Sequence, residues 1–228
     1  MVWTEKGTAG LTKILVEAAV ESLPEAVAAE EAGAGRIELC ADLTQDGLTP
    51  APALVASVTA RLGVPVFVMV RPRGGGFVYA DDEFDLMLRD VRGAGRSGLA
   101  GVVTGVLSPD GSVDAPRTRA LVEAAAPLPV TFHRAFDRVA DKASALEALI
   151  DAGVARVLTS GGAPTALEGA ETIAALVREA GDRMAILAGG GVRAHNVRDL
   201  IALTGVREVH SRFLGATAME LLVDAASG

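Results

Sequence analysis

The sequence predicts a (β/α)8 TIM-like barrel, and three observations support this fold class. Short runs of β-branched residues recur about every 25–30 residues along the chain. Segments rich in Ala, Leu and Glu separate them, an alternation that indicates βα units around a parallel sheet. No linker or change of composition divides the 228 residues. Eight such units in a chain of this length make a compact barrel.

Eight runs are the expected strands. The alternative is an open, doubly wound sheet, which usually has fewer strands and often a Gly-rich turn after the first one. The loop that follows the first run, residues 20–22, contains no glycine, which favours the barrel. In chain order the expected strands are residues 14–18, 36–40, 66–71, 101–106, 130–133, 156–160, 185–189 and 208–211.

The intervening helices have recognisable ends. Ser22 is placed to cap a helix over residues 23–32, and Asp141 to begin one over residues 142–152. Gly205 is placed to close the seventh helix. We therefore expect a single domain over residues 1–228, with residues 1–12 as a flexible N-terminal segment.

Composition excludes several classes of protein. Half of the residues are hydrophobic and 22% are charged, which excludes a disordered chain. The net charge of −8 argues against nucleic acid as a partner. A membrane-spanning helix needs about 20 apolar residues, and no stretch here approaches that. Glu17 interrupts the first apolar stretch, so we expect no signal peptide. The single cysteine, Cys40, fits a reducing compartment and a cytoplasmic protein.

The barrel interior is expected to be charged. Strand side chains alternate between the interior and the dry helix layer, so the alternate positions that carry polar residues should face inward. Ions in a dry core cost several kcal/mol each unless they are paired, so these charges predict mutual pairing or a bound ligand. The expected inward residues are Leu15, Glu17, Glu38, Cys40, Phe67, Met69, Arg71, Arg73, Thr104, Thr131, His133, Glu208 and His210.

Two interpretations of the inward charges stay open: a structural ion-pair network, or an active site at the C-terminal strand ends. We expect Glu17, Arg71, Arg73 and His133 to line one pocket. Arg71 should hold Glu17 or Glu38 ionised, because a nearby cation lowers a carboxyl pKa. His133 should then exchange protons near neutral pH, as a general acid or base does.

Two glycine-rich loops follow late strands, at residues 160–162 and 189–191. Glycine lets backbone N–H groups approach an anion, and many barrels bind phosphate with their last two βα loops. Tight packing is the alternative reason for these glycines. Arg212, after the eighth strand, is placed to add a cation, and residues 74–76 suit a hinge in a mobile loop.

Several strings occur together: Arg36-Ile-Glu-Leu-Cys40, Gly47-Leu-Thr-Pro50, Arg71-Pro-Arg-Gly-Gly75, Thr131-Phe-His-Arg-Ala-Phe-Asp137 and Val157-Leu-Thr-Ser-Gly161. In this combination the chain resembles the copper homeostasis protein CutC family, from about residue 14 to residue 211. The resemblance implies a cytosolic TIM-like barrel, a homodimer and a role in copper handling. Ala19 stands where many members of that family carry a cysteine, and Gly76 where an aspartate is more usual.

Copper binding is the first functional hypothesis. Cu(I) prefers two or more soft ligands. Cys40 and Met69 share the interior on adjacent strands, so they are the candidate metal ligands. The alternative is that Cys40 is a buried thiol that packs as a small hydrophobic residue.

The second hypothesis is a small-molecule enzyme, or a sensor derived from one, that acts on a phosphorylated or sugar-like anionic ligand at the barrel mouth. Whether such a site is catalytic stays open, because a binding barrel uses the same groups. The catalytic candidates are Glu17, Glu38, Arg71 and His133, and the ligand-binding candidates are Arg73, Thr104, Arg134, Ser160, Gly189, Gly190, Gly191 and His210.

Overall fold

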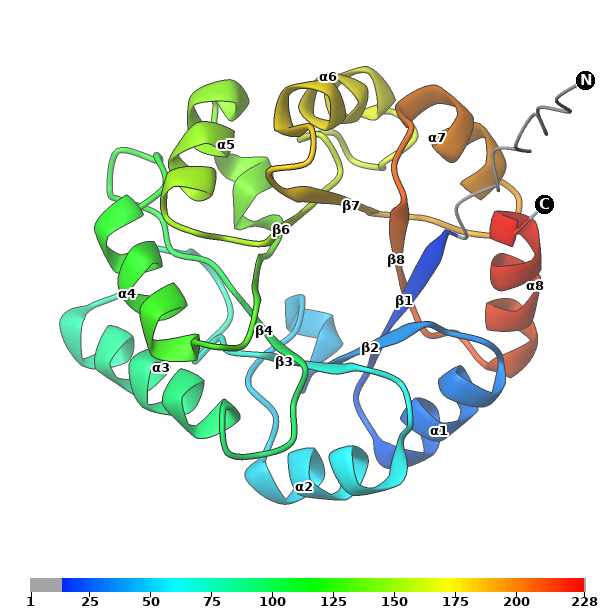
Figure 1. The fold of residues 1–228 in the computed structure, drawn as a ribbon, viewed down its shortest axis with the longest axis horizontal. Helices are drawn as coiled ribbons and strands as arrows, with labels where there is room; N and C mark the ends of the chain where they lie inside the picture. Colours follow the sequence, from blue (N-terminus) through cyan, green and yellow to red (C-terminus); the bar gives the residue numbers. More distant parts are fainter. Residues whose placement is uncertain (1–13, 228) are drawn as a thin grey trace, which may run out of the picture.

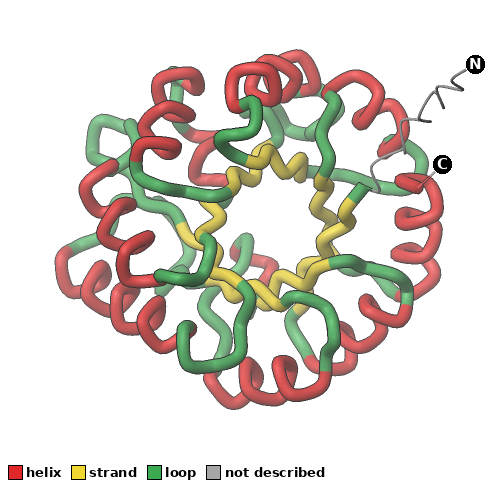
Figure 2. The backbone as a smooth tube through the Cα atoms, in the orientation of Figure 1, coloured by secondary structure: helices red, strands yellow, loops and turns green. Residues whose placement is uncertain are grey.

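Eight parallel strands close into a barrel, and helices surround it (Figures 1 and 2). The computed structural model describes residues 14–227, so the expected flexible segment of residues 1–12 lies outside the described residues. Each strand pairs with the next in the chain, and β8 pairs with β1 to close the ring. The strands are β1 (Leu15–Val20), β2 (Arg36–Leu39), β3 (Val66–Met69), β4 (Gly101–Thr104), β5 (Val130–Phe132), β6 (Arg156–Thr159), β7 (Ala185–Gly189) and β8 (Glu208–Arg212).

All eight predicted strands are present in the predicted order, so the barrel is confirmed and the open sheet is wrong. The strand ends differ from the predicted ones by at most two residues. The helices are α1 (Leu23–Glu31), α2 (Pro52–Arg61), α3 (Asp81–Ala94), α4 (Ala115–Ala125), α5 (Lys142–Asp151), α6 (Ala170–Ala180), α7 (Val197–Thr204) and α8 (Ala216–Ser227), with short turns η1 (Leu43–Gln45) and η2 (Arg134–Arg138). None of the helices within residues 14–227 is long and apolar enough to cross a membrane.

The helix ends follow local chemistry. The Ser22 hydroxyl accepts the backbone N–H of Glu25 at 3.3 Å and caps α1. The Asp141 carboxylate caps α5 through the N–H of Ser144 at 3.0 Å. Gly205 ends α7 with a φ of 70°, a left-handed conformation that favours glycine. All three predicted boundaries are therefore confirmed.

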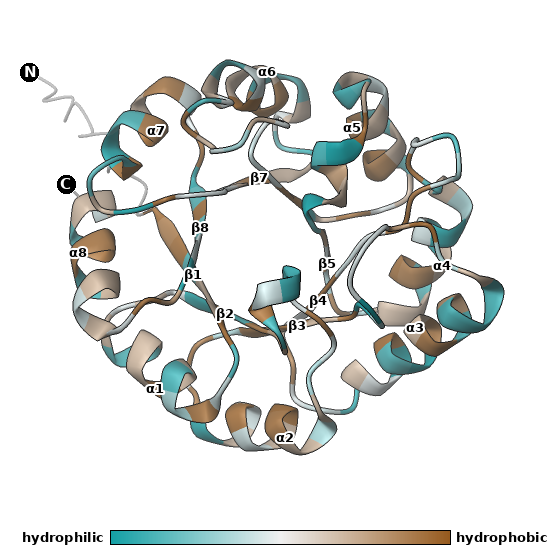
Figure 3. Cartoon of the chain, turned by 180° about the vertical axis from the view of Figure 1, so that it is seen from behind, coloured by the Kyte–Doolittle hydropathy of each residue, from teal (hydrophilic) through white to brown (hydrophobic). Residues whose placement is uncertain are grey.

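Most of the hydrophobic core lies between the sheet and the helices. Ile37, Leu39 and Phe132 are fully buried there. Inside the barrel a smaller apolar cluster contains Cys40, Phe67, Met69 and Val103. Polar and charged side chains also face the interior, among them Glu17, Glu38 and Arg36. The turn that follows β2 lies across the barrel opening (Figure 3).

The expectation that Thr104 faces the interior is wrong. In the β4–β5 register Val103 pairs with Thr131 and Thr104 pairs with Phe132, which belongs to the helix layer. The Thr104 hydroxyl donates to the carbonyl of Val70 at 3.0 Å. Side chains alternate along a strand, so Val103 is the inward residue and Thr104 packs toward the helices.

Candidate functional site

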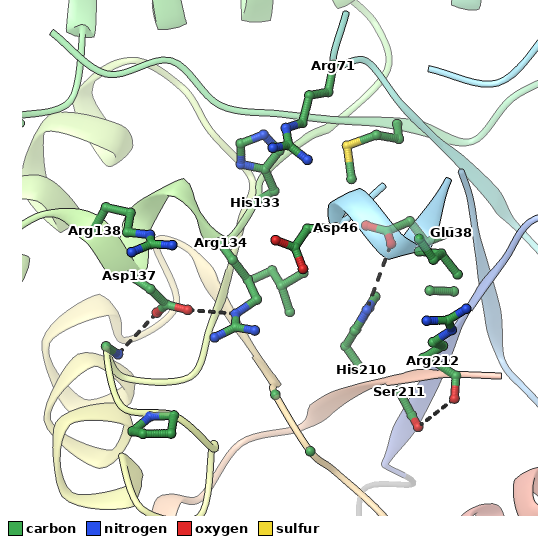
Figure 4. Close-up of a pocket in the computed structure, with 18 of the residues that line it drawn as sticks. Glu38, Asp46, Arg71, His133, Arg134, Asp137, Arg138, His210, Ser211 and Arg212 are labelled. Carbon is green, nitrogen blue, oxygen red and sulfur yellow. Dashed lines mark hydrogen bonds and ion pairs between the residues drawn. The ribbon is translucent and has the colours of Figure 1, made fainter. Parts of the chain in front are cut away.

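A cavity of about 570 Å³ opens at the C-terminal ends of the strands (Figure 4). Its walls come from loops that follow most of the strands, which is the usual place of a ligand site in this fold. The chain carries a net charge of −8, yet the lining is rich in cations. Five arginines (Arg71, Arg134, Arg138, Arg193 and Arg212) face three carboxylates (Glu38, Asp46 and Asp137).

An ion network lies beneath the cavity floor. The Arg36 guanidinium pairs with Glu17, and with Glu208 at 2.6 Å. Arg156 pairs with Glu208 at 2.6 Å. The ring of Phe67 lies 5.0 Å from the Arg36 guanidinium and 5.2 Å from that of Arg156. Pairing and stacking together compensate the cost of burying these charges.

Arg36 and Arg156 were not among the predicted inward residues. The sequence nevertheless indicated that Arg36 faces inward, because Arg36, Glu38 and Cys40 occupy alternate positions along the same stretch of chain. Arg156 likewise sits on the inward side of β6, where its guanidinium donates to the Thr131 hydroxyl at 3.2 Å. Both arginines stand at the starts of strands, at the bottom of the barrel, far from the expected active-site end.

His210 connects this network to the cavity. Its Nδ1 lies 2.7 Å from a Glu17 oxygen, and its Nε2 lies 3.8 Å from Oε2 of Glu38. Burial alone would raise the pKa of Glu17, but the hydrogen bond with His210 and the charge of Arg36 lower it to about 2. Burial alone would lower the pKa of His210, but the carboxylates of Glu38 and Glu17 raise it.

Glu38 lies on the cavity floor with one oxygen bonded and one free. The Cys40 thiol donates to Oε2 at 3.4 Å, while Oε1 is buried without a hydrogen-bond partner among residues 14–227. Burial raises the pKa of Glu38, and Glu17 raises it further. Burial also raises the pKa of the Cys40 thiol, and Glu38 adds to the effect. The thiol therefore stays protonated, and it lies behind the cavity lining.

Arg71 holds the loops of the cavity wall. Its guanidinium donates to the carbonyls of Gln45, Gly47 and Gly75 and lies 5.0 Å from the ring of Phe77. It does not pair with Glu17 or Glu38, so that expectation is wrong: Arg36 fills this role for Glu17. The Nε of Arg71 is buried and has no acceptor within the described part of the chain.

His133 lines the cavity, as predicted, but its protonation differs from the prediction. Burial and the neighbouring Arg71 lower the pKa of His133 to about 3, so the ring is neutral near pH 7. Its Nδ1 accepts the N–H of Ala135 at 3.2 Å, which places the ring proton on Nε2. That Nε2 is buried and unpaired among the described residues. His133 thus carries an unused hydrogen-bond donor beside the cavity.

Two other expectations about the pocket are wrong. Arg73 lies outside the cavity, where it pairs with Glu83 at 2.5 Å and stacks over Tyr79. Strand β3 ends at Met69, so the alternation that predicted an inward Arg73 no longer applies beyond it. Glu17 lies below the floor and reaches the cavity only through His210. The structure therefore gathers Arg71 and His133 with Glu38 and His210.

The glycine-rich loops form a further part of the cavity wall. Gly190 and Gly191 line the cavity with φ values of 114° and 70°. Arg134 donates to the Ser160 hydroxyl at 3.0 Å and pairs with Asp137 at 2.8 Å. A side chain on Gly190 would meet Ser160 at 3.0 Å and the Arg134 guanidinium at 3.7 Å. The positions of Gly190 and Gly191 at the cavity favour an anion subsite.

Gly189 has a packing role instead. A Cβ atom there would lie 2.5 Å from Leu158, and Gly189 is not part of the lining. Asp137 was not predicted as a site residue, although it organises this wall. Its carboxylate accepts the N–H groups of Ser160 and Gly162 and the hydroxyl of Thr159. A single aspartate after a strand is not a pattern that predicts this role.

The lining has two chemically distinct sides. The lining residues Arg71 and His133 each have a buried donor, Nε and Nε2, and Glu38 has a buried acceptor, Oε1, all without a partner among residues 14–227. A buried polar atom without a partner costs about 1–3 kcal/mol, so a ligand that pairs with these atoms recovers that cost. The arrangement fits a small molecule with an anionic end and a donor or cation at the other end.

Residues 14–215 match the family model described as the CutC family. A CutC family protein of Xanthomonas campestris pv. campestris (strain 8004) is 50% identical over 206 residues, which cover 90% of this chain and 86% of that protein. A protein of Mus musculus named copper homeostasis protein cutC homolog is 44% identical over 209 residues, which cover 91% of this chain and 77% of the mouse protein. The crystal structure of a CutC protein from Streptococcus agalactiae has a TM-score of 0.83 and 34% identity, covering 86% of this chain and 97% of that one.

Arg36→Met should lower the free energy of unfolding by about 3–5 kcal/mol, because it leaves the buried Glu17 carboxylate without its cation. Urea unfolding followed by circular dichroism measures the loss. Arg183→Met is the control, since the Arg183–Glu147 pair is about half exposed and such pairs contribute less than about 1 kcal/mol. Equal losses in the two variants would contradict a structural role for the Arg36 pair.

His133→Asn should make the protein less sensitive to mild acid than the wild type. The folded-state pKa of His133, about 3, lies below the ordinary 6.5, so the unfolded chain binds the proton first. Between pH 6.5 and pH 5 the wild type should lose up to about 2 kcal/mol more stability than the variant. Urea unfolding at both pH values measures this difference. His195→Asn, on an exposed loop, should behave as wild type. Identical pH slopes for wild type and His133→Asn would refute a neutral, buried His133.

Proposed function

The chain belongs to the CutC family, and from this premise we propose that it takes part in copper homeostasis by binding a small anionic molecule at the mouth of its barrel. The family supports the copper role, which the name of the mouse relative states for that protein. The cavity supports the anionic ligand. The observation that carries this proposal is the pair of buried, unpaired donors, Arg71 Nε and His133 Nε2, in a lining with five arginines.

The donor side suits an oxyanion for physical reasons. Hydrogen bonds from a guanidinium to an anionic oxygen are shorter and about twice as strong as neutral ones. His133 adds a neutral donor, and Phe77 covers both groups, with its ring centroid 5.0 Å from the His133 ring. Arg134 and the Gly190–Gly191 turn extend the positive wall. A carboxylate or phosphate group is the chemical class that pairs with all of these.

Inorganic phosphate is the simplest probe of this site. Titration calorimetry should detect phosphate binding to the wild-type chain. Arg71→Met and Arg134→Met should each weaken it by at least about tenfold, because a hydrogen bond to a charged group contributes about 1.5–3 kcal/mol. Arg73→Met is the matched control, since Arg73 lies outside the cavity on the same loop and should leave affinity unchanged.

Two results would contradict the anion site. One is the absence of phosphate binding to the folded wild-type chain. The other is an equal loss of affinity in Arg73→Met and Arg71→Met. Because Arg71 also holds three loop carbonyls, Arg134→Met, whose side chain is 43% exposed, provides a variant that keeps those contacts.

The sulfur atoms of the interior offer only a weak binding site for a copper ion. Cu(I) binds thiolates and thioethers, and the predicted ligands Cys40 and Met69 both pack around Gly47. The Cys40 thiol is protonated and fully buried, so binding requires loss of its proton. Ala19 lines the cavity at the position where many family members have a cysteine, so this chain has no second thiol there. We therefore propose one thiol and one thioether as the whole soft site.

Competition with a Cu(I) chelator tests the soft site. The wild-type chain should lose copper readily to the chelator, Cys40→Ser should abolish the residual binding, and Met69→Leu should weaken it. Met87→Leu, in the helix-layer core, should have no effect. Stoichiometric copper binding that survives Cys40→Ser would show that the copper ligands lie elsewhere.

The proposal also includes a cellular compartment, the cytoplasm, and an oligomeric state, a homo-oligomer. The buried free thiol of Cys40 supports a reducing compartment, and hence the cytoplasm. The homo-oligomer is proposed from the family resemblance.

A further inference from the structure

The acceptor side of the cavity contains a histidine and a carboxylate that face each other. Nδ1 of His210 is paired with Glu17 at 2.7 Å, so the other ring nitrogen is turned toward Glu38 (Figure 4). The 3.8 Å between His210 Nε2 and Glu38 Oε2 is too long for a hydrogen bond. One atom from each of Glu17, Glu38 and His210 lies within 4.8 Å of the others.

A second observation points to a ligand at the same place. Glu38 is 3% exposed, and its Oε1 has no hydrogen-bond partner among the described residues, although the side chain lines the cavity. An unpaired carboxylate oxygen in this setting calls for a donor or a cation.

The balance of charge beneath the cavity agrees with a cation. Three interior carboxylates (Glu17, Glu38 and Glu208) share two interior guanidiniums (Arg36 and Arg156). Arg36 and Arg156 pair with Glu17 and Glu208, and within residues 14–227 neither guanidinium forms an ion pair with Glu38. Among the described residues Glu38 is therefore the interior carboxylate that pairs with no guanidinium, and it lies 3.8 Å from His210 Nε2.

We propose that His210 Nε2 and the Glu38 carboxylate bind one divalent transition-metal ion of the zinc type on the cavity floor. Zinc lies at most about 2.1 Å from nitrogen and about 2.2 Å from oxygen ligands, so a nitrogen and an oxygen that share one ion are at most about 4.3 Å apart, and the observed spacing is within that limit. Imidazole and carboxylate suit such an ion, whereas Cu(I) prefers the sulfur atoms. The remaining coordination positions face the cavity.

Glu17 is the positioning residue of this metal site. A metal-bound histidine usually gives its other N–H to a carboxylate, which fixes the ring and raises its basicity. Glu17 does this for His210, and Arg36 in turn keeps Glu17 ionised and in place. The proposal goes beyond the anion site and does not rest on it, because zinc and phosphate binding are measured separately.

Zinc alone tests the proposal on the full, untagged chain. Titration against a zinc indicator should show one site in the wild type. His210→Ala and Glu38→Gln should each weaken it by at least about tenfold, and Glu17→Gln by about 10–100-fold. His195→Ala should bind as wild type does, because His195 is exposed and lies outside the cavity lining.

A second measurement on the wild type avoids variants that fail to fold. Nitrogen-15 spectra of the three histidine rings should show a zinc-dependent shift at Nε2 of His210, with His133 and His195 unchanged. The proposal is overturned by either of two results: no zinc site in the wild type, or zinc binding that survives His210→Ala.

Discussion

The buried ion pair between Arg36 and Glu17 is the interaction on which the rest of the site depends. A carboxylate at the centre of a barrel is stable in its ionised form only if a cation reaches it, and Arg36 is that cation. Once Glu17 is ionised, it fixes the ring of His210, and His210 in turn faces Glu38. A chain of contacts thus runs from the bottom of the barrel to the floor of the cavity.

The same constraint explains why the cavity has two sides. The network uses its own arginines below the floor, so Arg71 is free to hold three loop carbonyls in the cavity wall beside His133. Glu38 remains as the acid that no arginine reaches. Donors on one wall and an acceptor on the floor suit a ligand with opposite ends, and this polarity is the physical basis of the proposed function.

The fold followed from the sequence because each strand and helix carries its own local signal. The alternation of polar residues also placed Glu38, His133 and His210 inside correctly. The alternation gave the wrong orientation for Thr104, because β4 is short and has valines on both faces, so its sequence does not show which face is inward. It also gave the wrong position for Arg73, because β3 ends at Met69. It missed Arg36 and Arg156, although Arg36 alternates with Glu38 along β2 and pairs in register with Glu17 of β1.

The protonation of the site was beyond sequence reasoning for a related reason. A histidine pKa depends on burial and on charges from distant strands, and these place His133 and His210 on opposite sides of the ordinary value. The two histidines look alike in the sequence, because each directly follows a strand residue that faces the helix layer. Only their neighbours in space, Arg71 for one and two carboxylates for the other, separate them.

The most direct measurement is a crystal structure of the full chain grown with zinc and phosphate, with anomalous data collected on both sides of the zinc absorption edge. The Arg36–Glu17–His210 arrangement predicts a zinc peak between His210 Nε2 and Glu38, and phosphate against the wall of Arg71 and Arg134. A zinc peak at Cys40 and Met69, with neither ion in the cavity, would contradict it.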